Sequence, residues 1–244
     1  MARKFFVEST NIKGDYLSLS GDEHNHLSKV LRAKPDEEMI ACTKDYEYLC
    51  KIEKIEKTQT LCKIISKTKI ENDSLNITLF QASLKGEHMD YAIQKATELN
   101  VKTFVPFLSS FVVAKIDNKK VERFKKISQE ACKQSGRKAL MEIGDVLTFE
   151  QMLEELKSFD KVIFAYENSN VSAKEVISSL KETDEIALIV GSEGGFSEME
   201  AQKLVANGAK EISLGKNILR GETAGLVLAS AVMFELNQFK KIWK

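Results

Sequence analysis

Short apolar segments separated by turn-forming residues dominate the first 70 positions of the chain. Segments with β-forming composition recur at 4–9, 15–20, 38–43, 47–55 and 60–68. One short helix fits residues 22–32, because Leu27, Val30 and Leu31 recur at helical spacing. This pattern predicts a small, mostly antiparallel β-barrel or sheet over residues 1–70, with the polar stretch 70–76 as its boundary.

From residue 74 onward the pattern changes to strands that alternate with helices. Strands are expected at 76–83, 101–107, 161–166, 185–190 and 211–215. Helices are expected at 87–100, 118–136, 149–157 and 172–181, after Ser197, and from about Glu222. Such alternation predicts an α/β fold with a parallel sheet covered on both faces. The run Ile186–Val190 is continuously apolar, as expected of a strand that is buried on both faces.

The buried strand ends in a glycine-rich loop, GSEGG, at residues 191–195. Ligands bind at the carboxyl ends of strands in open α/β sheets, and glycines let a ligand approach the backbone. Ser197 and Glu200 then form a capping box that starts the next helix. Glu193 argues against a phosphate ligand, because its carboxylate would repel phosphate and no P-loop lysine follows. A plain tight turn with an exposed glutamate is the alternative.

A second loop of the same kind, residues 213–225, follows the next predicted strand. Ile218 and Leu219 are apolar residues inside this loop and suit the walls of an apolar slot. We expect the two strands to be adjacent, so that their loops form a cleft for an adenosine-like ligand without phosphate. Arg220 and Glu222 place opposite charges at the entrance of the last helix, where an ordinary surface ion pair is the alternative.

The net charge of the chain is zero, but its basic residues are unevenly distributed. Residues 115–138 contain nine basic and three acidic residues, a local net charge of +6. The helix in this stretch carries one stripe at steps of three and four, formed by Lys119, Arg123, Lys126, Glu130, Lys133 and Arg137. A row of cations suits a phosphate backbone and makes binding salt-dependent. A solvated helix face in a lysine-rich protein is the alternative.

The four cysteines, at positions 42, 50, 62 and 132, form no C-x-x-C pair and match no zinc spacing. We therefore expect free thiols in a reducing compartment and no metal site. No apolar run approaches the roughly 20 residues that span a bilayer. The apolar segment near the N-terminus is too short for a signal peptide, so a cytoplasmic location is expected.

Five motifs occur in this order along the chain: HNHLSKVLRAK, IQKATELNV, EACKQSGR, IVGSEGGFSEMEAQ and SLGKNILRGETAG. Together they resemble the bacterial 16S ribosomal RNA uridine-N3 methyltransferases, which belong to the SPOUT superfamily. The resemblance covers nearly the whole chain. It implies a PUA-like β-barrel RNA-binding domain over residues 1–70 and a SPOUT methyltransferase domain, with a trefoil-knotted parallel sheet, over residues 74–244.

The resemblance also implies the ligand, the assembly and the substrate. S-adenosylmethionine is expected as the cofactor, held in a cleft that the knot forms. A homodimer is expected, with the cleft of each subunit against its partner. The expected substrate is 16S ribosomal RNA within the small ribosomal subunit, methylated at N3 of one specific uridine.

Three groups of site residues follow from the resemblance and the patterns above. Cofactor binding is assigned to Val190, Gly191, Glu193, Gly194, Gly195, Leu214, Gly215, Ile218, Leu219, Arg220, Thr223 and Ala224. Arg220 is expected to stabilise the anion that develops on the uracil, with Glu222 or water as the proton acceptor. RNA binding is assigned to Arg32, Lys85, Lys119, Arg123, Lys126, Lys133, Gln134 and Arg137.

Three places depart from the family pattern. Ser192 stands where proline is usual, Ser110 and Phe111 occupy the place of a frequent arginine, and Gly221 replaces a commoner threonine. We expect Ser192 to loosen the glycine loop. Two other functions stay open, a SPOUT methyltransferase that acts on another ribosomal RNA position or on tRNA, and a non-catalytic ribosome-binding factor with a vestigial cofactor pocket.

Overall fold

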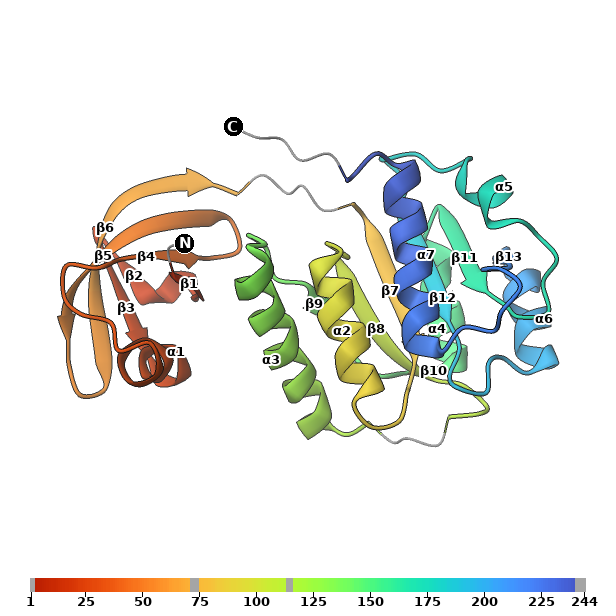
Figure 1. The fold of residues 1–244 in the computed structure, drawn as a ribbon, viewed down its shortest axis with the longest axis horizontal. Helices are drawn as coiled ribbons and strands as arrows, with labels where there is room; N and C mark the ends of the chain where they lie inside the picture. Colours follow the sequence, from red (N-terminus) through yellow and green to blue (C-terminus); the bar gives the residue numbers. More distant parts are fainter. Residues whose placement is uncertain (1–2, 71–74, 113–115, 240–244) are drawn as a thin grey trace. The chain divides into compact units, whose positions relative to one another are not determined.

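The computed structural model describes residues 3–70, 75–112 and 116–239, and they group into two compact units. One unit contains the described residues up to Ile70 together with Cys132–Leu140, and the other unit contains the rest (Figure 1). Positions 71–74 of the boundary that the sequence predicts lie outside the described residues.

The N-terminal unit is built on a six-stranded sheet in the order β1-β4-β5-β6-β3-β2. Its elements are β1 (Arg3–Phe6), η1 (Ser9–Asn11), β2 (Ile12–Lys13), β3 (Tyr16–Ser20), β4 (Glu38–Cys42), β5 (Tyr46–Ile55) and β6 (Gln59–Lys69). Every strand pair is antiparallel except that of β1 with β4. The predicted mostly antiparallel sheet is therefore confirmed, and Phe5, Leu17, Met39 and Ile52 are buried in its core.

The short helix of this unit is less regular than its sequence suggests. α1 (Gly21–Asn25) continues directly into a π-helical turn, η2 (His26–Val30). In that turn the N–H of Leu31 donates to the carbonyl oxygen of His26, 2.9 Å away and five residues back. The wider turn rotates the side chains that follow, so that Leu27 is fully buried while Val30 is 70% exposed. The expectation that Val30 shares the apolar face is wrong for this reason.

The second unit is built on a sheet whose strands are all parallel, in the order β10-β8-β7-β12-β11-β13, with β9 also paired to β8. The strands are β7 (Ile77–Ala82), β8 (Thr103–Leu108), β9 (Glu142–Ile143), β10 (Leu147–Thr148), β11 (Lys161–Ala165), β12 (Ile186–Val190) and β13 (Lys210–Ile212). The predicted α/β fold with a parallel sheet is thus confirmed.

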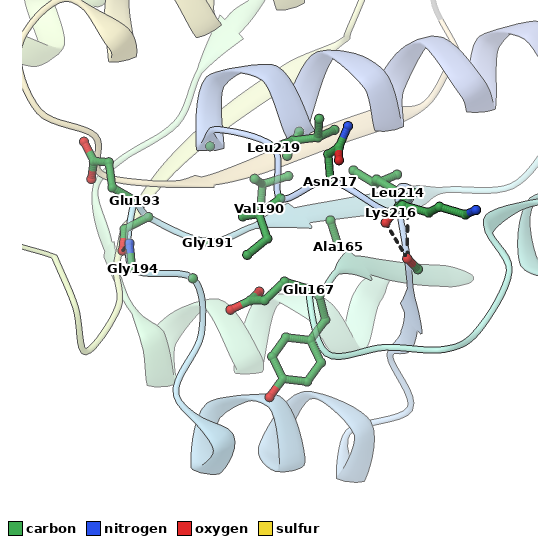
Figure 2. A pocket seen from close by; sticks show the side chains of 18 residues that line it. Ala165, Glu167, Val190, Gly191, Glu193, Gly194, Leu214, Lys216, Asn217 and Leu219 are labelled. Atoms are coloured by element: carbon green, nitrogen blue, oxygen red, sulfur yellow. Dashed lines mark hydrogen bonds between the residues drawn. The ribbon is translucent and has the colours of Figure 1, made fainter.

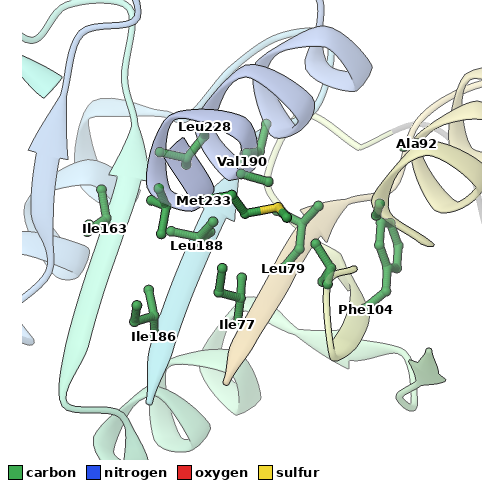
Figure 3. Close-up of a cluster of buried hydrophobic side chains, with 14 of the residues drawn as sticks. Ile77, Leu79, Ala92, Phe104, Ile163, Ile186, Leu188, Val190, Leu228 and Met233 are labelled. Atoms are coloured by element: carbon green, nitrogen blue, oxygen red, sulfur yellow. The ribbon is translucent and has the colours of Figure 1, made fainter. Parts of the chain in front are cut away.

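Helices cover both faces of this sheet. They are α2 (His88–Glu98), α3 (Asn118–Ser135), α4 (Phe149–Glu155) with the turn η3 (Leu156–Ser158), α5 (Ala173–Ile177), α6 (Glu198–Ala206) and α7 (Gly221–Glu235). Side chains of α2, α3, α5 and α7 join one buried cluster, while those of α4 and α6 join another. Along β12, Leu188 belongs to the first cluster, which Figure 3 shows. Ile189 belongs to the second cluster, so the strand is buried on both faces.

The strand order corrects one expectation from the sequence. The strands that precede the two glycine-bearing loops are β12 and β13, and they are not adjacent, because β11 lies between them and pairs with both. The chain enters β12 from α5, which packs on one face, and leaves it through α6, which packs on the other. The return through α6 carries the chain past β11 before β13 begins.

All four cysteines are free and buried, as the sequence predicts. Burial raises the pKa of the Cys62 thiol to about 12 and that of Cys50 to about 11. No cluster of three or more potential metal-binding His, Cys, Asp or Glu residues occurs within the described part of the chain. Within the same residues, every helix is too short or too polar to cross a membrane.

Candidate functional site

The loop after β12 is a tight turn that depends on glycine. The N–H of Gly195 donates to the carbonyl oxygen of Ser192 at 3.0 Å. A Cβ atom at Gly191 would lie 2.9 Å from the carbonyl carbon of Gly195, closer than real Cβ atoms approach. Gly195 also has φ +67°, which side chains other than glycine rarely adopt. The two ends of the loop therefore touch through backbone alone.

The predicted capping box at the start of α6 is present. The N–H of Glu200 donates to Ser197 Oγ at 3.3 Å, and the N–H of Ser197 donates to Glu200 Oε2 at 2.9 Å. The other carboxylate oxygen, Oε1, accepts from the N–H of Ser110 at 2.8 Å. The buried carboxylate of Glu200 thus joins the start of α6 to the segment that follows β8.

The positions that depart from the family pattern also contact this loop. Phe111 packs on Gly194, where an added Cβ would come within 2.9 Å of the Phe111 Cβ. Ser192 is buried, and its Oγ accepts from the N–H of Gly194 at 3.4 Å. A proline side chain has no acceptor for that bond, so Ser192 adds a contact inside a turn that is already closed. That Ser192 loosens the loop stays a prediction.

A pocket of about 260 Å³ lies at the carboxyl ends of β11, β12 and β13 (Figure 2). Of the residues assigned to cofactor binding, the structure brings together here Val190, Gly191, Glu193, Gly194, Gly195, Leu214, Gly215, Ile218, Leu219 and Ala224. Arg220 and Thr223 are exposed at the start of α7 and do not line it. Ser192 and Gly221 complete the walls that these two loops provide.

Sequence reasoning missed the contribution of β11. Ala165, Tyr166 and Glu167, at and just after its end, line the pocket between the two loops. Ser213, Lys216 and Asn217 of the second loop also line it. The carboxylate of Glu167 lies against Gly195, in the space that a Cβ at that glycine would need. The sequence contains a signal for these β11 residues, because every parallel strand ends at the same edge of the sheet. The sequence does not indicate, however, that β11 lies between β12 and β13.

Both acidic residues of the predicted loops have partners outside them. Oε1 of Glu193 accepts from the backbone N–H of Lys85 at 2.7 Å. Oε1 of Glu222 lies 2.9 Å from Nδ1 of His88, and the Glu222 side chain is only 10% exposed. Arg220 is the N-cap residue of α7 and does not form the surface ion pair with Glu222 that was the alternative, since Glu222 is buried against His88.

A buried amide supports the carbonyl of the first loop glycine. Nε2 of Gln81, at the end of β7, donates to the carbonyl oxygen of Gly191 at 3.1 Å and to that of Ala82 at 3.2 Å. Gln81 is fully buried. A Cβ at Gly225 of α7 would lie 3.1 Å from Gln81 Oε1, so a glycine in this helix leaves room for the amide.

The residues assigned to RNA binding fall into both units. Lys85, Lys119 and Lys126 are exposed in the second unit, as is Arg123, which pairs with Asp90. In the N-terminal unit, Arg32 and Gln134 are exposed. Lys115, where the basic stretch begins, lies outside the described residues.

The predicted basic stripe is not uniformly exposed. Lys133 lies 2.9 Å from Glu23, its side chain is 12% exposed, and its Nζ is 5.8 Å from the centre of the Phe5 ring. Burial lowers the pKa of the Arg137 guanidinium. The expectation of one continuous solvent-facing stripe is therefore wrong at Lys133, because the last turn of α3 packs within the N-terminal unit.

Comparison with known proteins agrees with this geometry. Residues 71–233 match the RNA methyltransferase domain family, and residues 19–65 match the RNA methyltransferase PUA domain family. The chain is 34% identical to ribosomal RNA small subunit methyltransferase E of Bacillus subtilis, over 96% of both chains.

Solved structures with a bound ligand are also similar. The enzyme of that name from Neisseria gonorrhoeae, bound to S-adenosylmethionine, is 28% identical with a TM-score of 0.85, over 96% of this chain and 98% of that one. A methyltransferase from Legionella pneumophila in complex with the same cofactor is 27% identical with a TM-score of 0.87, at the same coverage.

The backbone contact at Gly191 predicts a large difference between neighbouring substitutions. Gly191→Ala should lower the free energy of unfolding by about 1–3 kcal/mol, because the new methyl group overlaps the Gly195 backbone. Ser192→Ala, which removes only the long bond to Gly194, should cost less than about 1 kcal/mol. Urea unfolding of both variants measures the difference, and equal effects would contradict the close-contact account.

Proposed function

The chain belongs to the RNA methyltransferase family that includes ribosomal RNA small subunit methyltransferase E, and on that basis we propose that it methylates N3 of one specific uridine in 16S ribosomal RNA, with S-adenosylmethionine as the methyl donor. The observation that carries the proposal is the pocket at the ends of three parallel strands. Residues of both glycine-bearing loops line this pocket.

The residues around the pocket fit this cofactor. Backbone groups of Gly191, Gly194 and Gly195 and the apolar side chains Val190 and Leu219 suit an adenosine moiety. The carboxylate of Glu167 suits hydroxyl groups or a cation, and it disfavours the phosphates of a nucleotide. A phosphate-binding enzyme is therefore not supported. When bound, S-adenosylmethionine supplies an electrophilic methyl group on a sulfonium.

Arg220 is the residue that we assign to the chemistry. Uracil N3 becomes nucleophilic only after it loses its proton, which leaves negative charge on the ring and its carbonyl oxygens. Arg220 is exposed at the N-terminus of α7, one residue before Gly221, which lines the pocket. A guanidinium stays protonated and donates in a fixed fork, so Arg220 stabilises the developing anion and does not take up the proton.

Water is the proton acceptor that we favour over Glu222. The Glu222 carboxylate is buried and lies 2.9 Å from His88 Nδ1. A group held in this way is poorly placed to meet a proton that leaves an RNA base at the surface, because a general base must lie within hydrogen-bond reach of that proton. Bulk water next to the exposed Arg220 reaches the same proton without rearrangement.

The proposal extends to the RNA, the assembly and the location. Exposed cations, among them Lys85, Lys119 and Lys126, suit contacts to the phosphates of the small-subunit RNA, and the PUA-like unit suits a second contact. We include the knotted crossing and the homodimer implied by the sequence resemblance, and a cytoplasmic location, where the small ribosomal subunit is assembled.

A methylation assay on isolated small subunits and on free 16S ribosomal RNA, with the modified base mapped, tests the function. We expect labelling of a single uridine at N3. Labelling of another base or of tRNA would show that the protein is a methyltransferase with a different specificity. Failure to bind S-adenosylmethionine in calorimetry, together with retained binding to small subunits, would favour a non-catalytic ribosome-binding factor.

Arg220 provides a sharper test of the mechanism. Arg220→Ala should lower kcat by about 100-fold or more, the usual cost of removing one donor from an anion-stabilising site. The Kd for S-adenosylmethionine should change little, because Arg220 does not line the pocket. Single-turnover kinetics and calorimetry measure the two quantities, with Arg220→Lys as the charge-conserving control. Near-normal turnover of the alanine variant would show that Arg220 takes no part in the chemical step.

The outer face of α7 supports the homodimer. Val227 and Phe234 lie seven residues apart on this helix, and they are 39% and 73% exposed. The inner face of the same helix is apolar as well, with Leu228 and Val232 buried. A helix that is apolar on all sides is expected to be covered on all sides.

A charge on the outer face of α7 should therefore disrupt the dimer. Light scattering should give the wild type twice the chain mass of 27.5 kDa, while Phe234→Glu should shift it towards the monomer. Met199→Glu is the control, because Met199 is also exposed, at 66%, but lies on α6. A monomeric wild type, or a Phe234→Glu variant that stays dimeric, would contradict this interface.

A further inference from the structure

Residues 83–88, which join β7 to the first residue of α2, are held by one loop of the pocket and by the helix that follows the other loop. From the loop after β12, Oε1 of Glu193 accepts from the Lys85 N–H at 2.7 Å. From the first turn of α7, Oε1 of Glu222 lies 2.9 Å from Nδ1 of His88. Two carboxylates from distant parts of the sequence thus hold one short segment at two positions, Lys85 and His88, which are three residues apart.

Apolar packing fixes the inner side of the same segment. Leu84 is 3% exposed and lies against the start of α7, where a Cβ at Gly221 would come within 2.8 Å of Leu84 Cδ2. The segment therefore cannot shift without disturbing α7. Gly86 has φ +58° and nothing within 4 Å of its Cβ position, so this glycine is needed for the turn and not for space.

The outer side of the segment is exposed and presents one cation, Lys85, that suits a contact to RNA phosphate. Lys85, Gly86 and Glu87 are exposed, whereas Ser83 and Leu84 are buried. Arg220 directly precedes the glycine on which Leu84 packs, so Lys85 and Arg220 are both exposed cations at this edge of the sheet. The carboxyl edge of a parallel sheet is also where ligands of such folds bind.

We propose that Glu193 and Glu222 are positioning residues that fix the Lys85–His88 segment as the RNA-facing wall of the site. The proposal rests on the proposed function only in taking RNA as the substrate. Glu193 belongs to one of the loops that line the pocket, and Glu222 belongs to the first turn of α7, whose Gly221 and Ala224 line it, so the RNA-facing wall is held by elements that also form the cofactor pocket.

This role differs from the cofactor contact that the sequence assigns to Glu193. Figure 2 shows the Glu193 side chain pointing away from Glu167, whereas Glu167 lies among the strand ends. A carboxylate that accepts from a backbone N–H forms a charge-assisted bond, which is about twice as strong as a neutral one. Glu193 is therefore engaged by the protein before any ligand arrives.

Amide hydrogen exchange of the ligand-free protein tests the contact directly. Glu193→Ala should speed exchange at the Lys85 amide about tenfold or more, as expected for loss of a hydrogen bond to a charged group. Glu193→Gln keeps an acceptor oxygen and should restore most of the protection. Glu167→Ala is the matched control, because it removes a pocket carboxylate that lies against Gly195 instead. Unchanged exchange in Glu193→Ala would overturn the proposal.

The kinetic arm separates positioning from cofactor binding. Glu193→Ala should raise the KM for RNA about fivefold or more while the Kd for S-adenosylmethionine changes less than about twofold, since lost positioning of a binding wall weakens one ligand selectively. The reverse pattern, weak cofactor binding with unchanged KM for RNA, would indicate that Glu193 contacts the cofactor and would overturn the proposal.

His88 tests the second carboxylate without altering the buried Glu222. His88→Ala should speed exchange of the segment and raise the KM for RNA, whereas His88→Gln, which keeps a donor for Glu222, should do so less. If the two variants showed the same exchange rates and the same KM for RNA, the positioning role of Glu222 would be overturned. The exchange experiments need neither cofactor nor RNA, so their outcome tests the positioning role independently of the proposed function. The proposed function is overturned if the wild-type protein does not methylate RNA.

Discussion

The site depends on one close backbone contact, between Gly191 and Gly195 at the end of β12. Because these residues touch, the chain reverses within five residues and enters α6 through the capping box of Ser197 and Glu200. The reversal places residues 191–195 along the pocket and brings Oε1 of Glu193 to the Lys85 N–H. A side chain at Gly191 would separate the two ends of the loop, and the geometry of the pocket would change with them.

The position of β12 in the sheet determines which segments surround that loop. β12 is paired with β7 on one side and with β11 on the other, and all three strands run parallel. Their carboxyl ends therefore reach the same edge, where Gln81 of β7 supports the Gly191 carbonyl and Glu167 after β11 lies against Gly195. Apolar clusters on both faces keep β12 in this register, since a shift by one residue would exchange Leu188 and Ile189 between them.

The acidic residues of the site have different tasks because their surroundings differ. Glu167 lines the pocket and is exposed there. Glu200 is buried and accepts three hydrogen bonds, two from Ser197 at the start of α6 and one from the N–H of Ser110 in the segment after β8. Glu193 and Glu222 contact the segment that starts α2. The same side-chain chemistry therefore contributes to the pocket surface in one place and forms contacts within the protein in the others.

The sequence by itself determined most of the elements and the two glycine-bearing loops that line the pocket. The apolar run of β12, the glycines after it and the capping box at Ser197 are local signals, because period, cap and turn preferences act over a few residues. Only the tertiary structure decided that β11 separates β12 from β13, that Glu167 enters the pocket and that Lys133 pairs with Glu23. Strand order and side-chain partners join residues that are far apart in the chain, and no local pattern in a single sequence encodes which of them meet.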